Sequence, residues 1–128
     1  MTLRVLVAED EVLVAHSLAD LLEGEGHAVH LAFDGEAALM AARSLGGAMD
    51  VLLTDLNMPG LPGEELIRLL RAERPGLPVV VITGSPPLGG VEELRRHAGG
   101  NGLLVLLHKP IDDAELFAAL HEAAARTS

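Results

Sequence analysis

The sequence predicts an α/β protein in which a parallel sheet of five strands lies between two layers of helices. Short apolar runs alternate along the chain with segments whose apolar residues recur at the spacing of an α-helix. Strands and helices that alternate in this way build a parallel sheet covered on both faces. The run from Pro78 to Thr83 is apolar up to its last residue, as expected of a strand buried on both faces.

The first half of the chain contains three expected strands and two expected helices. In order, they are a strand at Leu3–Ala8, a helix at Glu11–Glu23, a strand at Ala28–Ala32, a helix at Gly35–Leu45 and a strand at Asp50–Thr54. The core stripe of the first helix is predicted to consist of Val14, Leu18, Leu21 and Leu22. Gly24 ends this helix, and Gly46 and Gly47 close the second one, because glycine favours the conformation that terminates a helix.

The second half continues the alternation with longer loops. In order, we expect a loop at Met58–Gly63, a helix at Glu64–Arg74, a strand at Pro78–Thr83, a loop at Gly84–Gly90, a helix at Val91–Ala98, a strand at Leu103–Leu107 and a helix running to about Arg126. Pro75 and Gly76 stop the third helix, since the residue before a proline disfavours helical backbone. Asp112 is a suitable N-cap for the last helix.

Composition excludes several functional classes. The chain has 128 residues and no cysteine, which fits a single domain (1–128) without disulfide or thiolate chemistry. Its formal net charge of -10 disfavours nucleic acid and anionic membrane surfaces as partners. Its apolar runs are far shorter than the roughly 20 residues of a membrane span. We therefore expect a cytoplasmic protein.

Charged and hydroxyl side chains follow four of the predicted strands. Glu9 and Asp10 follow the first strand, Asp55 follows the third, and Thr83 and Lys109 stand at the ends of the fourth and fifth. In such sheets function collects beyond the carboxyl ends of the strands, so these groups are expected to converge. Three clustered carboxylates suit Mg²⁺. With Lys109 and the Thr83 hydroxyl, they form the electrostatic set that phosphoryl transfer needs.

The ordered motifs resemble the response-regulator receiver domains of bacterial two-component signalling. They are Glu9-Asp10, the stretch from Asp50 to Gly60, Gly63, Thr83-Gly84 and Lys109-Pro110, and the resemblance covers about Leu3 to Ala125. It implies that Asp55 accepts a phosphoryl group from a phosphohistidine, with Thr83 and Lys109 assisting. It also implies Mg²⁺ held by the side chains of Glu9, Asp10 and Asp55 and by the backbone carbonyl of Asn57.

The resemblance further implies a flavodoxin-like strand order, 2-1-3-4-5, which is the order already known for receivers. The implied partners are a sensor histidine kinase or a histidine phosphotransfer domain, and an unknown downstream protein. Two features depart from the family. Many receivers have an aromatic switch residue three positions before the lysine, where this chain has Leu106. The segment from Thr83 to Lys109 also looks long and is rich in glycine and proline.

Two other functional classes fit the sequence less well. A phosphohydrolase of the haloacid-dehalogenase type needs a second aspartate two residues after its nucleophile, where this chain has Asn57. A flavodoxin-like redox module needs a hydroxyl-rich phosphate loop after the first strand, where this chain has acids.

The sequence supports four finer expectations. The Lys109–Pro110 peptide bond is predicted to be cis, which proline makes inexpensive. Leu13 is predicted to be exposed beside the acceptor site, where it contacts a phosphodonor helix. Crowded acids are predicted to destabilise the metal-free fold. Phosphorylation is predicted to order the loop Gly84–Gly90 and the helix after it, unless the protein is a phosphate sink.

Overall fold

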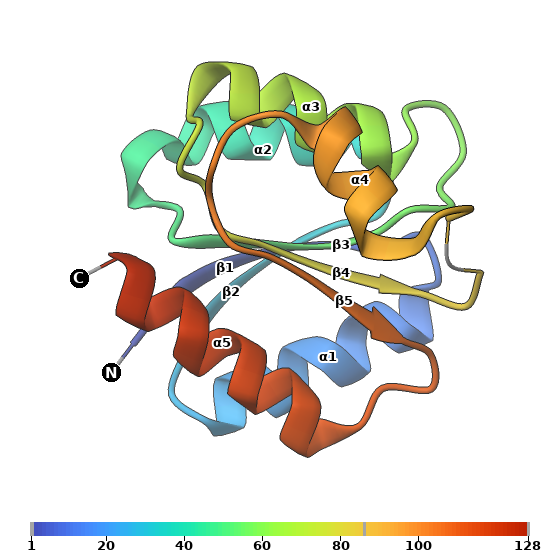
Figure 1. Cartoon of the computed structure of the whole chain (residues 1–128). Helices are drawn as coiled ribbons and strands as arrows, with labels where there is room; N and C mark the ends of the chain where they lie inside the picture. Colours follow the sequence, from blue (N-terminus) through green and yellow to red (C-terminus); the bar gives the residue numbers. More distant parts are fainter. Residues whose placement is uncertain (1, 86, 128) are drawn as a thin grey trace.

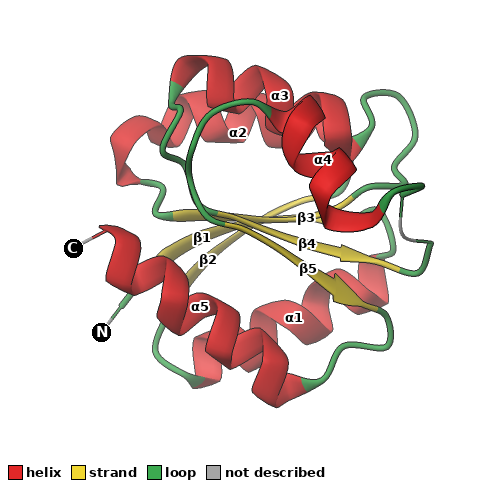
Figure 2. Cartoon of the chain, viewed as in Figure 1, coloured by secondary structure: helices red, strands yellow, loops and turns green. Residues whose placement is uncertain are grey.

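The computed structural model describes residues 2–85 and 87–127, and in it strands and helices alternate as the sequence predicts (Figures 1 and 2). The strands are β1 (Arg4–Ala8), β2 (Ala28–Ala32), β3 (Val51–Asp55), β4 (Val79–Thr83) and β5 (Leu104–His108). The helices are α1 (Val12–Gly24), α2 (Gly35–Leu45), α3 (Gly63–Glu73), α4 (Gly90–Ala98) and α5 (Asp113–Thr127), with a short 3₁₀ turn, η1 (Gly46–Ala48), after α2. Most of the predicted ends of strands and helices differ by one residue from the ends in the structure, and the sequence did not predict η1. Pro86, part of the predicted loop Gly84–Gly90, lies outside the described residues.

The five strands form one parallel sheet in the order β2-β1-β3-β4-β5, which confirms the order implied by the family resemblance. Each strand pairs in parallel with its neighbours. Helices α1 and α5 cover one face, and α2, α3 and α4 cover the other (Figure 1). All strands therefore point their carboxyl ends to one edge of the sheet.

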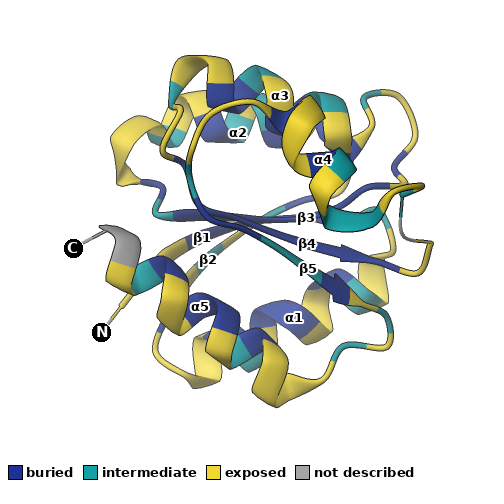
Figure 3. Cartoon of the chain, viewed as in Figure 1, coloured by how far each residue is buried: buried dark blue, intermediate teal, exposed yellow. Residues whose placement is uncertain are grey.

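Burial follows from this layering, because the central strands contact helices on both faces. Every residue of β3 and β4 is buried, whereas β2 at the sheet edge alternates between exposed and partly buried positions until its last residue, Ala32, which is buried (Figure 3). Two apolar clusters result, one on each face of the sheet. None of the helices in the described part of the chain has the length and apolar character that crossing a membrane requires.

The predicted core stripe of α1 is correct only in part. Leu18 and Leu22 are buried, but Val14 and Leu21 are only partly buried. Ala15 and Ala19 are buried in their place. The buried stripe therefore consists of two alanines and two leucines, and the small alanine side chains let the helix approach the sheet closely.

The amino edge of the sheet is held by a buried cation. Arg71, near the end of α3, is only 3% exposed. Its guanidinium donates hydrogen bonds to the carbonyl oxygens of Leu77, Gly99 and Leu103, at distances of 2.7–3.2 Å. These carbonyls belong to the segments that lead into β4 and β5. One side chain therefore joins α3 to the loop that follows it and to the loop before β5, which lies 28–32 residues further along the chain.

Candidate functional site

Asp55 ends β3 at the carboxyl edge of the sheet and is only 3% exposed. The backbone N–H of Asn57 donates to its Oδ1 at 3.1 Å. The chain then passes close beneath it, because a Cβ built at Gly63 would lie 2.1 Å from the carbonyl oxygen of Asp55. Glycine is therefore required at the start of α3, and the turn after Asp55 is held tightly against the acceptor residue.

Lys109 follows β5 and reaches back across the edge of the sheet to Asp55. Its Nζ lies 2.8 Å from Asp55 Oδ2 and 2.8 Å from Glu9 Oε1. The peptide bond to Pro110 is cis, as predicted. Burial by itself lowers the pKa of Lys109, but its hydrogen bonds and charge attraction to Asp55 and Glu9 outweigh burial and raise the pKa well above the usual value. The ammonium is therefore kept charged at the site.

Glu9, directly after β1, is fully buried. Its Oε2 accepts a hydrogen bond from the backbone N–H of Glu11 at 3.1 Å. Its Oε1 forms an ion pair with Lys109 Nζ at 2.8 Å and has no other partner among the described residues. Burial raises the pKa of Glu9, and repulsion from Asp55 adds to this, while Lys109 and the Glu11 backbone partly offset it. The buried environment of Glu9 therefore disfavours the charged form of its carboxyl group.

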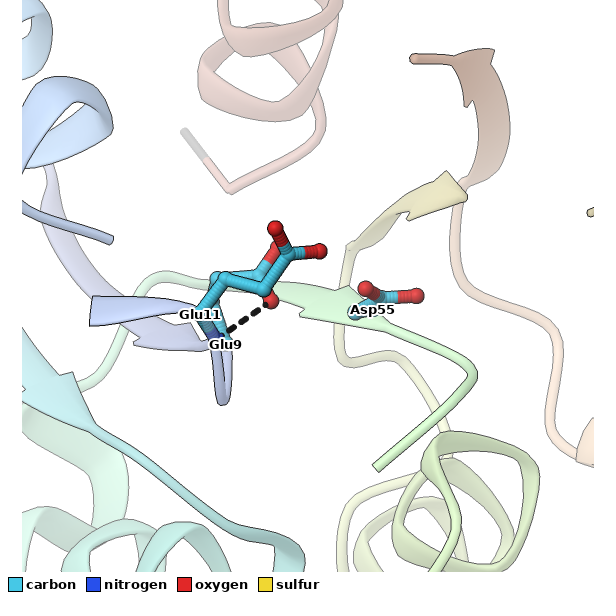
Figure 4. A group of neighbouring side chains, drawn as sticks. All are labelled: Glu9, Glu11 and Asp55. Atoms are coloured by element: carbon cyan, nitrogen blue, oxygen red, sulfur yellow. Dashed lines mark hydrogen bonds between the residues drawn. The ribbon is translucent and has the colours of Figure 1, made fainter. Parts of the chain in front are cut away.

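Three carboxylates meet here. One oxygen from each of Glu9, Glu11 and Asp55 lies within 4.8 Å of the others, and Figure 4 shows the three side chains. Hard oxygen ligands in this number fit Mg²⁺, and the buried Oε1 of Glu9 has Lys109 as its one partner in the part of the chain that the structure describes, which leaves it able to bind a metal ion as well. Asp10, which the sequence placed in this cluster, is partly exposed, and Glu11 stands in the group instead.

Thr83 ends β4, which pairs with β3 on the side away from β1, and it is fully buried. Its hydroxyl donates to the carbonyl of Ser85 and accepts from the Ser85 N–H, both at 3.1 Å. The side-chain amide of Asn57 donates to the same hydroxyl at 3.4 Å. The hydroxyl thus joins the turn after β3 to the turn after β4.

Comparison with known proteins identifies the family. Residues 5–121 match the model of the response regulator receiver domain. The chain belongs to the response-regulator receiver family. Receivers act in phosphorylation-dependent signalling, with histidine kinases and effectors as partners, and are not enzymes that turn over an external substrate.

Relatives and solved structures agree with this assignment. The chain is 38% identical over 108 residues to a response regulator receiver protein of Anaeromyxobacter sp. (strain Fw109-5), covering 84% of this chain and 43% of that protein. It is 37% identical over 124 residues to the transcriptional regulatory protein TcrA of Mycobacterium tuberculosis, covering 96% and 46%. The chain thus spans less than half the length of these curated relatives.

Among solved structures, a response regulator receiver domain from Clostridium thermocellum superposes with a TM-score of 0.87 at 26% identity, covering 98% of this chain and 96% of that one. The receiver domain of the hybrid histidine kinase CckA has a TM-score of 0.75 at 32% identity, covering 94% and 97%. Full-length coverage of isolated receivers confirms the fold class predicted from the sequence.

The structure brings most of the predicted site residues together. Glu9, Asp55 and Lys109 are in contact, and Asn57 joins Asp55 to Thr83. Glu11 was missed, because the sequence was interpreted as starting its first helix there. The signal for it was present: three consecutive acids follow the first strand, more than one helix N-terminus needs.

Proposed function

We propose that Asp55 is the phosphoacceptor of this receiver and that its phosphorylation changes the surface seen by a downstream partner. The observation that carries the proposal is the arrangement of Asp55: a buried carboxylate held by the Asn57 N–H on one oxygen and the Lys109 ammonium on the other. The donor would be a sensor histidine kinase or a histidine phosphotransfer domain, and the location would be the cytoplasm.

In the proposed step, one carboxylate oxygen of Asp55 attacks the phosphorus of a phosphohistidine. A P–O bond forms, the P–N bond breaks, and the electron pair of the broken bond leaves with the imidazole nitrogen. Asp55 reacts as the carboxylate, so no proton has to be removed from it. Lys109 donates a charged hydrogen bond to the transferring phosphoryl oxygens, and the Thr83 hydroxyl donates another after giving up its bond to Ser85.

Mg²⁺ would be held by the side chains of Glu9, Asp10 and Asp55 and by the backbone carbonyl of Asn57. When bound, it supplies the positive charge that offsets the acids and the phosphoryl oxygens. The buried Oε1 of Glu9 fits this set, because Lys109 is its one partner among residues 2–85 and 87–127 and a metal ion would add the charge that a buried carboxylate needs. Asp10 would have to turn toward the cluster to join it.

The test is labelling with acetyl phosphate and Mg²⁺, read by intact-protein mass spectrometry, and binding of BeF₃⁻. The wild type should gain the mass of one phosphoryl group, and Asp55→Asn should gain none. Asp20→Asn, which removes an exposed acid from α1, is the matched control and should label like the wild type. An Asp55→Asn protein that still gains one phosphoryl group would refute the assignment.

Docking of the donor is proposed at an apolar groove beside Lys109. The groove lies between α1 and the segment after β5, has a volume of about 550 Å³, and is lined by residues that include Leu13, Leu21, Pro110 and Ile111. Leu13 is 83% exposed, as the sequence predicts. Lys109, whose ammonium contacts Asp55, also lines the groove, so an occupant would lie next to the acceptor residue. The proposed occupant is the histidine-bearing helix of the kinase.

Leu13→Ala should slow phosphotransfer from the cognate kinase without changing labelling by acetyl phosphate. Met40→Ala is the matched control, because Met40 is 73% exposed on α2, on the opposite face of the sheet. Equal transfer rates for Leu13→Ala and Met40→Ala would contradict docking at this groove.

Output is proposed to run through the segment between β4 and β5. Leu106 on β5 is only partly buried and packs against the apolar cluster under α4. It has no polar tip, so its inward movement would change the surface less than a tyrosine's would. We expect phosphorylation instead to order the turn after Thr83 together with α4.

Amide hydrogen exchange with and without BeF₃⁻ tests this form of output. Protection should rise across residues 84–102. Exchange that changes only in the turn after Asp55 would favour a phosphate sink.

The protein is also proposed not to hydrolyse phosphomonoesters, because Asn57 cannot act as the general acid. Turnover of p-nitrophenyl phosphate would contradict this.

A further inference from the structure

Glu11 differs from the other two carboxylates of the site in its exposure and its role in the backbone. Its side chain is 64% exposed, whereas that of Asp55 is 5% exposed and that of Glu9 is fully buried. Glu11 is the N-cap residue of α1, yet its side chain makes no capping hydrogen bond. The carboxylate instead reaches Lys109, with 3.2 Å between Oε1 and Nζ. An N-cap position is therefore used to place a charge at the mouth of the site.

Lys109 has three N–H donors, and three carboxylates surround its ammonium. The contacts are 2.8 Å to Asp55, 2.8 Å to Glu9 and 3.2 Å to Glu11. A phosphoryl oxygen that takes a hydrogen bond from Lys109 must displace one of them. Glu11 is the partner that can leave, because its contact is the longest and its side chain can turn into water. Glu9 and Asp55 are fixed by burial.

We propose that Glu11 is a specificity-determining residue that selects against small, highly charged phosphodonors by competing with the phosphoryl group for Lys109. This inference rests on the proposed function of Asp55. A donor protein that docks through the neighbouring groove supplies binding energy that offsets the competition, and a small anion has no such contact. The same carboxylate adds negative charge beside the cation site, so it strengthens Mg²⁺ binding while it opposes the incoming phosphoryl group.

Glu11→Gln keeps the shape of the side chain and removes the charge. At saturating Mg²⁺, it should accelerate labelling by acetyl phosphate roughly two- to fivefold, the range that one exposed ion pair supports. Phosphoramidate carries one negative charge fewer, so its acceleration should be smaller. Calorimetric titration should show weaker Mg²⁺ binding, by a similar factor. Raising the ionic strength should reduce the differences between Glu11→Gln and wild type in both labelling rates and in Mg²⁺ affinity.

Asp20→Asn is the matched control, since it removes an exposed acid from the same helix, away from Lys109. It should leave both labelling rates and the Mg²⁺ affinity near those of the wild type. Opposite changes in Mg²⁺ affinity and labelling rate are the signature of competition, because a merely structural role would not separate them.

Three results would overturn the proposal: equal labelling rates for Glu11→Gln and wild type, slower labelling of Glu11→Gln at saturating Mg²⁺, or equal acceleration with both donors. Failure of the proposed function looks different. In that case neither donor would label the wild type, and labelling of Asp55→Asn would not differ from that of the wild type.

Discussion

Two cations, Arg71 and Lys109, are held inside this protein at opposite edges of one sheet. Arg71 lies at the amino edge and faces three backbone carbonyl oxygens. Lys109 lies at the carboxyl edge and faces three carboxylates. Burial lowers the pKa of Arg71, and repulsion from Arg95 adds to this, whereas the carboxylates raise the pKa of Lys109.

The difference shows how one fold separates stability from switching. Carbonyl groups are fixed by the backbone, so the bonds of Arg71 hold two loops in one arrangement. Carboxylates can change partner, and a metal ion or a phosphoryl group can replace the bonds of Lys109. We therefore expect the amino edge to respond to mutation through stability alone, and the carboxyl edge to respond to mutation and to Mg²⁺ together.

The largest effect is expected for Arg71→Met. The methionine keeps much of the stem but leaves the carbonyls of Leu77, Gly99 and Leu103 without their donor, at a cost of about 3–5 kcal/mol in the free energy of unfolding. Urea unfolding should show this loss equally with EDTA and with Mg²⁺. Arg43→Met, which removes an exposed ion pair to Glu73, is the control and should change stability little. A loss for Arg71→Met that Mg²⁺ repairs would break the comparison.

Lys109→Met should have the next largest effect, and it should depend on the metal. Without divalent ions, removing the ammonium leaves Glu9 and Asp55 as unpaired carboxylates and should cost about 2 kcal/mol. Mg²⁺ should restore part of the stability by mass action. The measurement is the urea midpoint in EDTA and in Mg²⁺ for both proteins. An equal loss of stability in EDTA and in Mg²⁺ would show that Lys109, like Arg71, has a structural role alone.

Neutralising Glu9 should act in the opposite direction. Burial and the nearby Asp55 raise its pKa, so the folded state disfavours the charged form. Glu9→Gln should then stabilise the metal-free protein at pH 7 by about 1 kcal/mol. The gain is limited because the amide cannot accept from both Lys109 and the Glu11 N–H.

The stability effect of Glu9 should also depend on pH. Because its folded pKa lies above the unfolded value of 4.5, its contribution to stability is favourable below that value and is lost as the pH rises through the folded pKa. The stability difference between Glu9→Gln and wild type should therefore shrink as the pH falls from 7 toward 5. A variant that is less stable than wild type in EDTA at pH 7 would disprove electrostatic strain at this edge.

The smallest effect is expected for His27 at the amino edge. Its Nδ1 accepts a hydrogen bond from the Leu3 N–H at 3.0 Å, and burial lowers its pKa. Its contribution is fully present above the unfolded pKa of about 6.5 and is lost as the pH falls through the folded value. Melting curves should show that the free energy of unfolding falls by about 1 kcal/mol or less below pH 6.5. His27→Gln should reduce that loss, and the exposed His30→Gln should leave it unchanged.

The sequence by itself determined the fold class, the order of elements along the chain and the residues at the strand ends. These depend on local chemistry: β-branched apolar runs, helical spacing and turn residues. Parallel strands also carry their carboxyl ends to one edge, which is why Glu9, Asp55, Thr83 and Lys109 could be placed near one another from the sequence alone.

Only the tertiary structure decided which side chains meet. It put Glu11 in the carboxylate cluster where Asp10 was expected, because the turn from β1 into α1 sets where each side chain points. It buried Ala15 and Ala19 where Val14 and Leu21 were expected, because the distance between helix and sheet depends on packing. It also made Arg71 a buried link between α3 and the distant loop before β5. Such contacts join residues far apart in sequence, and local pattern carries no record of them.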